Sequence, residues 1–423
     1  MITAPRGTQD FYGDEAARLS WIEEAFRRTA TLAGYSEIRT PMFEESALFE
    51  RGVGEGTDIV TKEMYTFEDK GGRKLALRPE GTAPVVRAIL EHDLLKTQKH
   101  LRLFYAGPMF RYERPQAGRY RQFHQVGVEY LGSASPVVDM AVILLSVDFL
   151  RELGLSKFTV RINNVGTFED RANYVKDLQA FFAHHVNELD EEDRAKVDRN
   201  PFRILDSKKP ATRDVVKAAP RVSAYLSKES VAHIARVVDY LKEAAPALEV
   251  AADPYLVRGL DYYTRTVYEV TSPELGAQDA LLGGGRYNNL IETFGGPPTP
   301  AFGFAAGVER LLLALRNRAP ERPPQLLYFV PLDDEALKEA AILTEHLRER
   351  GIPAQMDYEV GSLKSGLRHA NKSGFKFAFL IGPEELLRGE GLLKRLSDGA
   401  QWPVSLKADA IAEQLKQRQE ETS

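Results

Sequence analysis

The stretch FRYERPQAGRYRQFHQVGVE, residues 110–129, combines arginines with a proline- and glycine-containing loop and then a polar–apolar alternation. In its last part Gln125, Gly127 and Glu129 alternate with apolar residues, so they share one face of a predicted strand. A glycine between polar residues on a strand is typical of close approach by a ligand or another backbone. Because an apolar run, residues 101–105, comes before this stretch, the sequence predicts a hairpin with arginines at its tip.

Two interpretations of this hairpin are open. A sheet with one solvated face would carry Arg, Gln and Glu without any function. Phe123 favours the alternative, because it lies between Arg121 and Gln125 and a nucleotide base stacks on an aromatic ring with cations nearby. The stretch therefore predicts a nucleotide site.

Composition excludes several classes of protein. The 423 residues carry a formal net charge of -5, so any RNA contact would come from local basic patches rather than from a general excess of charge. The chain has no cysteine, which excludes disulfides and thiolate metal sites and is typical of a reducing compartment. The N-terminus lacks the apolar core of a secretion signal, and no long apolar run is free of charge. We expect a cytoplasmic protein that neither is secreted nor spans a membrane.

Sequence patterning divides the chain into a large and a small part. Strand periodicity is lost between about residues 165 and 250, where charge and helical spacing dominate, and this predicts a helical insertion. Prolines within residues 317–325 indicate a linker that closes a first domain, residues 1–325. From residue 326 to residue 423 strand and helix patterns alternate, which predicts a small α/β domain with βαβ connections.

A basic helix face is predicted in the small domain. On the helix expected over residues 362–372, cations recur every four residues: Lys364, Arg368 and Lys372. The face could simply be solvated, but no acid lies between residues 359 and 384, so we favour contact with RNA phosphates. A second basic cluster, residues 203–228 of the insertion, remains open between a solvated helix face and an RNA contact.

Three further blocks contain residues suited to polar ligands. LALRPEGTAP, residues 75–84, predicts a strand, a turn and a helix with Thr82 at the N-cap. Glu80 could favour the helix N-terminus electrostatically or bind a ligand. LVRGLDYYTRTVYEV, residues 256–270, places Arg258 beside a tyrosine pair ahead of a strand, where tyrosines are most often core residues.

The third block is rich in small residues. LGGGRYN, residues 282–288, and AFGFAAGVERL, residues 301–311, lead to a helix whose first turn contains Glu309 and Arg310. The chain lacks GxxxxGK[ST], so phosphate binding here would not be of the P-loop type.

These blocks together resemble the class II aminoacyl-tRNA synthetases, and among them the histidyl-tRNA synthetase family. Residues 110–129 resemble motif 2, residues 301–311 resemble motif 3, and RGLDYY resembles a signature that other class II enzymes lack. A long helix followed by a strand and a proline, residues 14–41, is similar to motif 1, which implies a homodimer interface, although this segment alone fits any α/β surface unit equally well. The resemblance covers nearly the whole chain, and the HIGH and KMSKS signatures of class I are absent.

The resemblance implies a fold and an activity. The fold would be an α+β catalytic domain with an antiparallel sheet, a helical insertion and a C-terminal α/β anticodon-binding-like domain. The activity would be that of a histidine–tRNA ligase, in which ATP and L-histidine give histidyl-adenylate and the histidyl group passes to the 3′-terminal ribose of tRNA(His). Mg²⁺ would accompany ATP without a dedicated protein cage.

The alternative is a non-catalytic, histidine-sensing paralogue that regulates ATP phosphoribosyltransferase. Such proteins characteristically lose the RGLDYY arginine block and the anticodon domain, whereas this sequence contains both.

The resemblance also implies roles for individual residues. The catalytic pair at the α-phosphate would be Arg258 and Arg111, and the remaining ATP-binding residues would be Arg119, Phe123 and Arg310. The histidine pocket would be formed by Glu80, Gly81, Thr82, Gln125, Glu129, Tyr262, Tyr263 and Tyr287. Within it, Glu129 and Tyr263 would take the two imidazole nitrogens. Contacts with tRNA would come from Gln116, Lys364, Arg368 and Lys372.

Overall fold

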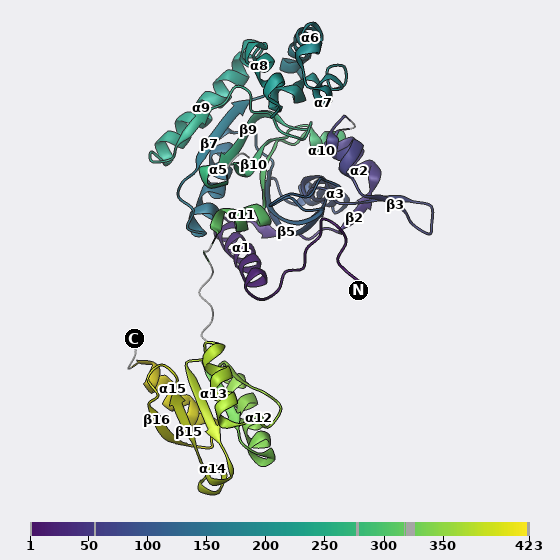
Figure 1. The fold of residues 1–423 in the computed structure, drawn as a ribbon. Helices are drawn as coiled ribbons and strands as arrows, with labels where there is room; N and C mark the ends of the chain where they lie inside the picture. The colour runs from purple at the N-terminus through teal and green to yellow at the C-terminus, as the bar shows by residue number, and fades with distance from the viewer. Residues whose placement is uncertain (1, 55, 276–278, 317, 319–325, 421–423) are drawn as a thin grey trace. The chain divides into compact units, whose positions relative to one another are not determined.

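Three β-sheets organise the chain, which this computed structural model describes over residues 2–54, 56–275, 279–316, 318 and 326–420. Contacts divide the chain into two units, residues 1–320 and residues 321–423 (Figure 1). Apart from Arg318, the predicted linker over residues 317–325 lies outside the described residues.

The largest sheet belongs to the first unit and has the strand order β1-β5-β6-β11-β10-β9-β7-β8. Its central pairs are antiparallel, and only the edge pairs β1–β5 and β7–β8 are parallel. The strands are β1 (Ser36–Glu37), β5 (Leu101–Phe110), β6 (Gln122–Leu131), β7 (Thr159–Asn164), β8 (Val250–Ala252), β9 (Thr264–Thr271), β10 (Ala280–Arg286) and β11 (Ala301–Gly307). The expected antiparallel sheet is confirmed.

The predicted hairpin lies near the centre of this sheet. Strands β5 and β6 pair in one register from Leu101 opposite Leu131 to Phe110 opposite Gln122. Val126 is buried in the core on one face, as the alternation predicts.

Four helices cover that face of the sheet. They are α1 (Gly13–Leu32), α5 (Pro136–Glu152), α9 (Lys228–Ala244) and α11 (Val308–Leu315). Phe26, Ile143, Leu241 and Leu311, one from each helix, share a core with residues from the strands. This packing leaves the other face of the sheet available for a site.

The opposite face carries a second core, which includes residues from the segment between β7 and β8. Leu178 and Ile204 of that segment share the core with Tyr262 and Tyr287. The segment's elements before α9 are α6 (Phe168–His184), η2 (Val186–Glu188), α7 (Glu191–Arg194), η3 (Pro201–Asp206), α8 (Pro210–Ala218) and η4 (Val222–Ala224). The helices between β7 and β8 are therefore split between the two faces of the sheet (Figure 1).

Shorter elements complete the first unit. A three-stranded sheet has the order β2-β4-β3, and β4 leads through a turn to α3 (Thr82–Glu91). The other elements are β2 (Phe43–Glu45), α2 (Ser46–Val53), η1 (Ile59–Glu63), β3 (Thr66–Glu68), β4 (Lys74–Leu77), α4 (Leu94–Thr97), η5 (Pro273–Leu275) and α10 (Leu290–Thr293).

The second unit is a five-stranded sheet with helices, in the order β13-β12-β14-β15-β16. Strands β12, β13 and β14 are parallel, which confirms the predicted βαβ connections, and an antiparallel pair absent from the prediction extends the sheet. The elements are β12 (Leu327–Pro331), α12 (Asp334–Glu349), β13 (Ala354–Met356), α13 (Leu363–Lys372), β14 (Phe377–Ile381), α14 (Pro383–Arg388), β15 (Glu390–Arg395), β16 (Gln401–Ser405) and α15 (Ala408–Glu420).

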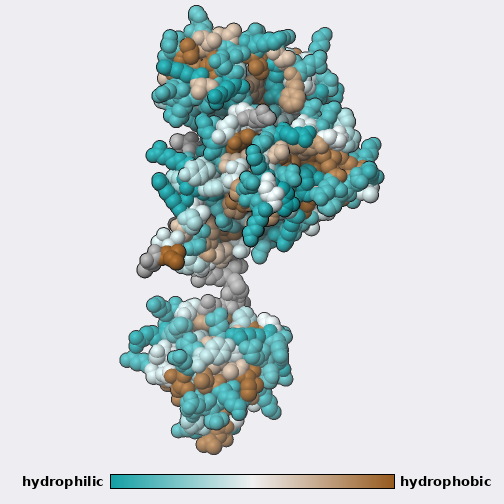
Figure 2. Space-filling view, turned by 90° about the vertical axis from the view of Figure 1, so that its right-hand side faces the viewer, coloured by the Kyte–Doolittle hydropathy of each residue, from teal (hydrophilic) through white to brown (hydrophobic). Residues whose placement is uncertain are grey.

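On the face shown in Figure 2, hydrophilic residues cover most of both units and apolar residues gather in smaller areas. Among the residues that the structure describes, no helix is long and apolar enough to cross a membrane.

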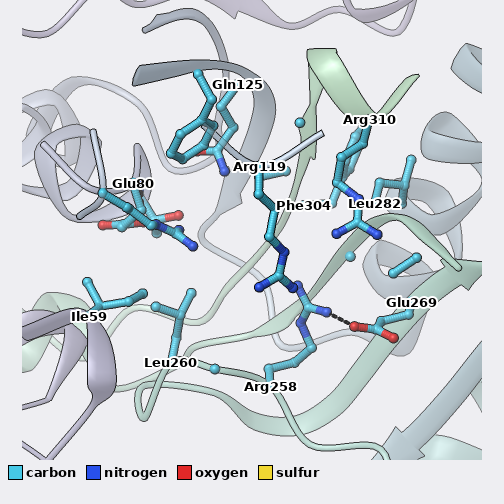
Figure 3. Close-up of a pocket in the computed structure, with 18 of the residues that line it drawn as sticks. Ile59, Glu80, Arg119, Gln125, Arg258, Leu260, Glu269, Leu282, Phe304 and Arg310 are labelled. Atoms are coloured by element: carbon cyan, nitrogen blue, oxygen red, sulfur yellow. Dashed lines mark hydrogen bonds and ion pairs between the residues drawn. The ribbon is translucent and has the colours of Figure 1, made fainter. Parts of the chain in front are cut away.

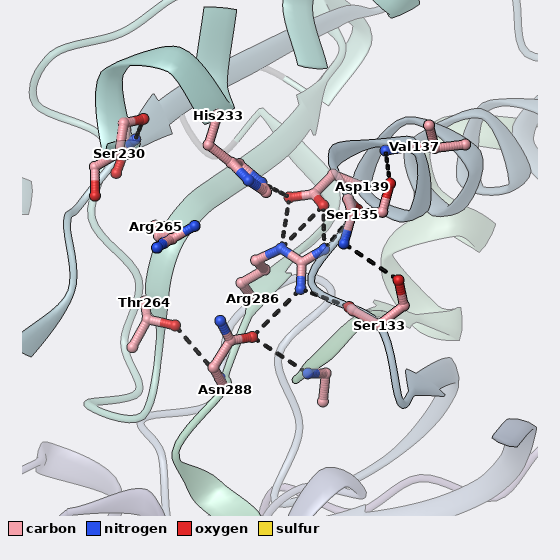
Figure 4. Close-up of polar contacts among 12 residues, drawn as sticks. Ser133, Ser135, Val137, Asp139, Ser230, His233, Thr264, Arg265, Arg286 and Asn288 are labelled. Carbon is pink, nitrogen blue, oxygen red and sulfur yellow. Dashed lines mark hydrogen bonds and ion pairs between the residues drawn. The ribbon is translucent and has the colours of Figure 1, made fainter. Parts of the chain in front are cut away.

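A buried ionic network joins α5, α9 and the end of β10 (Figure 4). The side chains of Arg286 and Asp139 are both fully buried, and the Arg286 Nη2 atom donates to Asp139 Oδ2 at 2.6 Å. The backbone oxygens of Ser133 and Ser135 accept two further Arg286 hydrogen bonds, at 3.0 and 2.8 Å. His233 Nε2 lies 3.1 Å from Asp139 Oδ1. The network ties one of the inserted helices to the sheet.

Removing Asp139 should strongly destabilise the first unit. Asp139→Ala leaves the Arg286 guanidinium buried without its carboxylate, and the expected loss in the free energy of unfolding is about 3–5 kcal/mol. Urea unfolding measures this loss. Asp148→Ala is the matched control on the same helix, because its partner Arg151 is exposed to solvent, and it should change stability little. Equal losses in the two variants would contradict the importance of the network.

Candidate active site

A cavity of about 420 Å³ lies on the side of the sheet to which Gln125 and Glu129 point (Figure 3). Most of the residues predicted for the site line this cavity: Glu80, Thr82, Arg111, Arg119, Phe123, Gln125, Glu129, Arg258, Tyr262, Tyr263, Tyr287 and Arg310. Residues from five separate parts of the sequence therefore meet at one place.

Five of the predicted residues do not line the cavity. Gly81 packs against the ring of Tyr105, and Gln116 is on the loop between β5 and β6, where it pairs with Arg119 in an isolated bridge. Lys364, Arg368 and Lys372 are exposed on α13 of the second unit.

The start of α3 differs from the prediction. Thr82 is the first residue of the helix and Gly81 is the N-cap, so the expected Thr82 cap is wrong. The carboxylate of Glu80 replaces it, because it accepts from the backbone N–H groups of Thr82 and Ala83, both at 2.7 Å. Burial raises the pKa of Glu80, and these backbone bonds oppose the rise. Glu80 therefore does interact with the helix N-terminus, and these bonds hold its carboxylate at the cavity wall.

Glu129 is the central acid of the cavity, with only 1% of its surface exposed. The hydroxyl of Thr82 donates to Glu129 Oε1 at 2.7 Å, and the hydroxyl of Tyr287 donates to Oε2. Burial raises the pKa of Glu129 to about 8, although both hydroxyl donors favour the charged form. The interpretation of Glu129 as a solvated sheet residue is therefore excluded.

Glycines create the space for these polar groups. A Cβ atom at Gly303, which pairs with Glu129 across β11 and β6, would collide with Glu129 Oε2. Tyr105 occupies the space over Gly127, where a Cβ atom would lie 2.5 Å from the tyrosine ring, and also over Gly81. The predicted close approach of another backbone to Gly127 is confirmed, because a Cβ atom there would also lie 2.8 Å from the backbone oxygen of Phe304.

Sequence reasoning missed Tyr105, although a signal existed. This tyrosine belongs to the apolar run before the hairpin and lies directly opposite Gly127 in the register of β5 and β6. Its hydroxyl is 3.5 Å from Gln125 Oε1, so it also supports a polar residue of the cavity wall.

Tyrosines enclose the acidic end of the cavity. The rings of Tyr262 and Tyr263 are 4.8 Å apart, and those of Tyr262 and Tyr287 are 5.6 Å apart in an edge-to-face arrangement. The hydroxyl of Tyr262 lies 3.5 Å from Glu80 Oε2. These residues are buried, as the core interpretation requires, but they also line the cavity, so the two interpretations are compatible.

Arginines gather at the other end of the cavity (Figure 3). Arg258 forms an ion pair with Glu269, and a Cβ atom at Gly283 would lie 2.7 Å from the Arg258 guanidinium carbon. Burial lowers the pKa of Arg310, and the charges of Arg119 and Arg258 lower it further. Cations this close repel one another, which favours binding of a polyanion.

Phe123 also lines the cavity. The Arg111 guanidinium carbon is 5.4 Å from the centre of the Phe123 ring, and Arg111 Nε donates to the backbone oxygen of Pro79 at 2.8 Å. The buried Glu309, which sequence reasoning left without a role, accepts from the backbone N–H of His124 at 2.8 and 2.9 Å. The backbone beside the aromatic ring is thereby fixed to the start of α11.

The pKa of Glu129 predicts a pH-dependent stability. Because this pKa rises from 4.5 to about 8 on folding, its contribution to stability is complete below about pH 4.5 and is lost as the pH rises through 8. Relative to wild type, Glu129→Gln should gain stability between about pH 5 and pH 9, on the order of a few kcal/mol. Thermal unfolding across this range measures the difference.

The control for this experiment is Glu24→Gln, at an exposed position on α1. Its stability relative to wild type should stay constant over the same pH range. A constant difference for Glu129→Gln as well would mean that burial does not perturb this carboxyl group.

Comparisons with known proteins agree with this geometry. Residues 7–311 match a family model described as histidyl-tRNA synthetase, and residues 327–418 match an anticodon binding domain. The chain is 46% identical to a histidine–tRNA ligase of Halothermothrix orenii, covering 98% of this chain and 99% of that protein. It is 44% identical to one of Listeria innocua, covering 99% of each.

Solved structures include a similar fold. The apo histidyl-tRNA synthetase of S. aureus matches 98% of this chain and 100% of its own, with a TM-score of 0.81 and 36% identity. Because the family model covers most of the chain and the relatives match over nearly their full length, this chain belongs to the histidyl-tRNA synthetase family of class II aminoacyl-tRNA synthetases.

Proposed function

We propose that the cavity of the first unit activates L-histidine with ATP and that the histidyl group then passes to tRNA(His). The observation that carries this proposal is the presence, in one cavity, of a buried acid with hydroxyl donors and of an arginine cluster. The chain is a histidine–tRNA ligase by its similarity to such enzymes over the full length. The RGLDYY block and the anticodon-type second unit also disfavour a histidine-sensing regulatory paralogue.

The acidic end is proposed to hold histidine. A neutral imidazole has one N–H donor and one nitrogen acceptor, so a selective site needs an acceptor and a donor at matching positions. The Glu129 carboxylate has lone pairs beyond those used by Thr82 and Tyr287, and the Tyr263 hydroxyl can donate. A bound N–H donor would lower the pKa of Glu129 and so favour the charged form that accepts from it.

The remaining polar groups at this end are proposed to bind the α-amino group. Glu80 and Gln125 both line the cavity, and Glu80 keeps lone pairs beyond its two backbone bonds. Thr82 also lines the cavity, while Tyr262 and Tyr287 border the ring. Gly81 serves the pocket by leaving room for Tyr105.

The basic end is proposed to hold ATP. Arg111 and Arg258 would bind the α-phosphate, Arg119 and Arg310 the outer phosphates, and Phe123 the adenine face. A histidine carboxylate oxygen attacks the α-phosphorus, the bond to the bridging oxygen breaks, and pyrophosphate leaves. Fixed cations around the attacked phosphorus stabilise the charge of the transition state without a covalent intermediate on the protein.

Mg²⁺ would neutralise phosphate charge when it is bound with ATP. The cavity fits this ion because the carboxylates of Glu269 and Asp279 line it near the arginines, and Mg²⁺ takes one or two carboxylates beside phosphate oxygens and water. Among the described residues no group of three or more such side chains could hold a metal by itself.

We propose that the tRNA contacts residues of both units when the histidyl group is transferred to it. The terminal ribose hydroxyl attacks the adenylate carbonyl, and AMP leaves. Gln116, on the hairpin loop, and the exposed cations of α13 are the proposed tRNA contacts.

We further propose a cytoplasmic homodimer that pairs through residues 14–41. The proposed domains are residues 1–325, which include the insertion at about 165–250, and residues 326–423. The matched ranges 7–311 and 327–418 support this division.

Pyrophosphate exchange tests the activation step. Wild type should exchange pyrophosphate into ATP with histidine and with no other amino acid. Glu129→Ala should raise the KM for histidine far more than that for ATP, because it removes the imidazole acceptor. Arg258→Ala should instead lower kcat by about a hundredfold or more with little change in either KM. Exchange without added histidine would contradict the function, and an unchanged histidine dependence in Glu129→Ala would contradict the imidazole contact.

Binding of tRNA(His) tests the basic face of α13. Changing Lys364, Arg368 and Lys372 together to alanine should weaken binding and flatten its dependence on salt by roughly two to three units of slope. Pyrophosphate exchange should not change. The control triple, Lys338, Arg388 and Lys416 to alanine, removes exposed cations from other helices of the same unit. Equal effects of the two triple variants would mean that α13 contributes only to the overall charge of the unit and is not a specific tRNA contact.

A further inference from the structure

The segment between β8 and β9, residues 253–263, carries three proposed site residues and contains no helix or strand. We call it the RGLDYY loop. It presents Arg258 to the basic end of the cavity and Tyr262 and Tyr263 to the acidic end. Because no ladder of backbone hydrogen bonds fixes this loop, its conformation depends on side chains that reach it from elsewhere.

Asp261 is the one charged residue of RGLDYY that the proposed chemistry leaves without a role. Asn200 Nδ2, from the inserted segment, donates to Asp261 Oδ1 at 3.1 Å and to Oδ2 at 3.3 Å. Arg203 Nε, in η3 of the same segment, lies 3.7 Å from Asp261 Oδ1. The carboxylate therefore anchors the loop to the insertion.

Two carbonyl groups of the RGLDYY loop are held by the insertion as well. The guanidinium of Arg203 donates to the backbone oxygen of Gly259, the residue after Arg258. Arg171, on α6, donates through Nη2 to the backbone oxygen of Tyr263 at 2.9 Å. The insertion thus contacts the loop on both sides of Asp261, next to Arg258 and at the tyrosine pair.

Other contacts close the opposite side of Asp261. Its backbone N–H donates to the oxygen of Val53 at 3.1 Å. A Cβ atom at Gly54 would lie 2.6 Å from Asp261 Oδ2, so the chain after α2 packs directly against the carboxylate. Asp261 therefore lies between the insertion and the end of α2, with 38% of its side chain exposed, and a displaced loop could not keep all these contacts.

The charges around this anchor compensate one another. Burial raises the pKa of Asp261, while the charges of Arg203 and Arg171 and the hydrogen bond from Asn200 lower it. Burial likewise lowers the pKa of Arg171 to about 10, and Asp261 and Asp170 oppose this. Removing Asp261 would take away the negative charge that offsets the burial of Arg171 and lies beside Arg203.

We propose that Arg171, Asn200 and Arg203 are positioning residues, which act through Asp261 and the loop carbonyls to hold Arg258 at the reacting phosphate. This inference rests on the proposed activation of histidine by ATP. Arg203 of the insertion binds the carbonyl group of Gly259, the residue next to Arg258 in the chain. Glu269 binds the Arg258 guanidinium at the other end of the side chain. A misplacement of about 1 Å at such a group can cost on the order of a hundredfold in rate.

The test is a double-mutant cycle on pyrophosphate exchange. Asp261→Ala alone should lower kcat by about tenfold to a hundredfold and leave the KM values for ATP and histidine within about twofold. In an Arg258→Ala background, Asp261→Ala should cause almost no further loss, because the group it positions is absent. Equal losses with and without Arg258 would overturn the proposal, since a general defect of folding multiplies the rate by the same factor in both backgrounds.

Two further variants keep the test decisive if Asp261→Ala folds poorly. Asp261→Asn keeps the shape of the side chain but loses the attraction to the arginines, and it should show a smaller loss with the same dependence on Arg258. Arg171→Ala removes a bond to a loop carbonyl. Its matched control is Arg194→Ala, because Arg194 donates to the backbone oxygens of Leu189 and Asn187 within the insertion.

The expected results differ for these two arginines. Arg171→Ala should lower kcat in wild type and not in the Arg258→Ala background, whereas Arg194→Ala should leave kcat unchanged in both. An equal loss in Arg194→Ala and Arg171→Ala would also overturn the proposal. Failure of the proposed function gives a different result, namely wild-type protein that exchanges no pyrophosphate, or an Arg258→Ala variant that is fully active.

Discussion

The cavity of the first unit is built around one carboxyl group, that of Glu129, which lies inside a β-sheet. A carboxylate removed from water is costly unless hydrogen-bond donors surround it. Strand β6 supplies the acid, α3 supplies the hydroxyl of Thr82, and the residue after β10 supplies the hydroxyl of Tyr287. The neighbouring strand β11 has a glycine, Gly303, opposite the acid, and the missing side chain leaves room for the carboxyl group. Three elements distant in sequence therefore meet at one carboxyl group.

The two ends of the cavity carry opposite electrostatic costs, and the ligands proposed for each end would relieve them. At one end burial disfavours the ionised form of Glu129, and at the other end arginines repel one another. An amino acid with its N–H donors and a polyphosphate with its charge would satisfy these groups. Such a site lowers the stability of the free protein in exchange for selectivity, as functional sites often do.

Much of the site could be predicted from sequence, because alternation fixes which residues share a face of a strand. Gln125 and Glu129 do line one cavity together with residues from the other blocks. Alternation does not predict which residue from a distant part of the chain will contact a given side chain. The ring of Tyr105 fills the space over Gly127, and the Glu80 side chain takes the capping role expected of Thr82. Both depend on tertiary contacts that local patterns do not specify.

The pairing of Gly303 with Glu129 has a consequence for evolution and inhibition. Because any side chain at position 303 would collide with the acid on the adjacent strand, this wall of the cavity cannot be remodelled one residue at a time. An inhibitor that occupies the acidic end would contact a surface that a single substitution at position 303 cannot reshape without displacing Glu129.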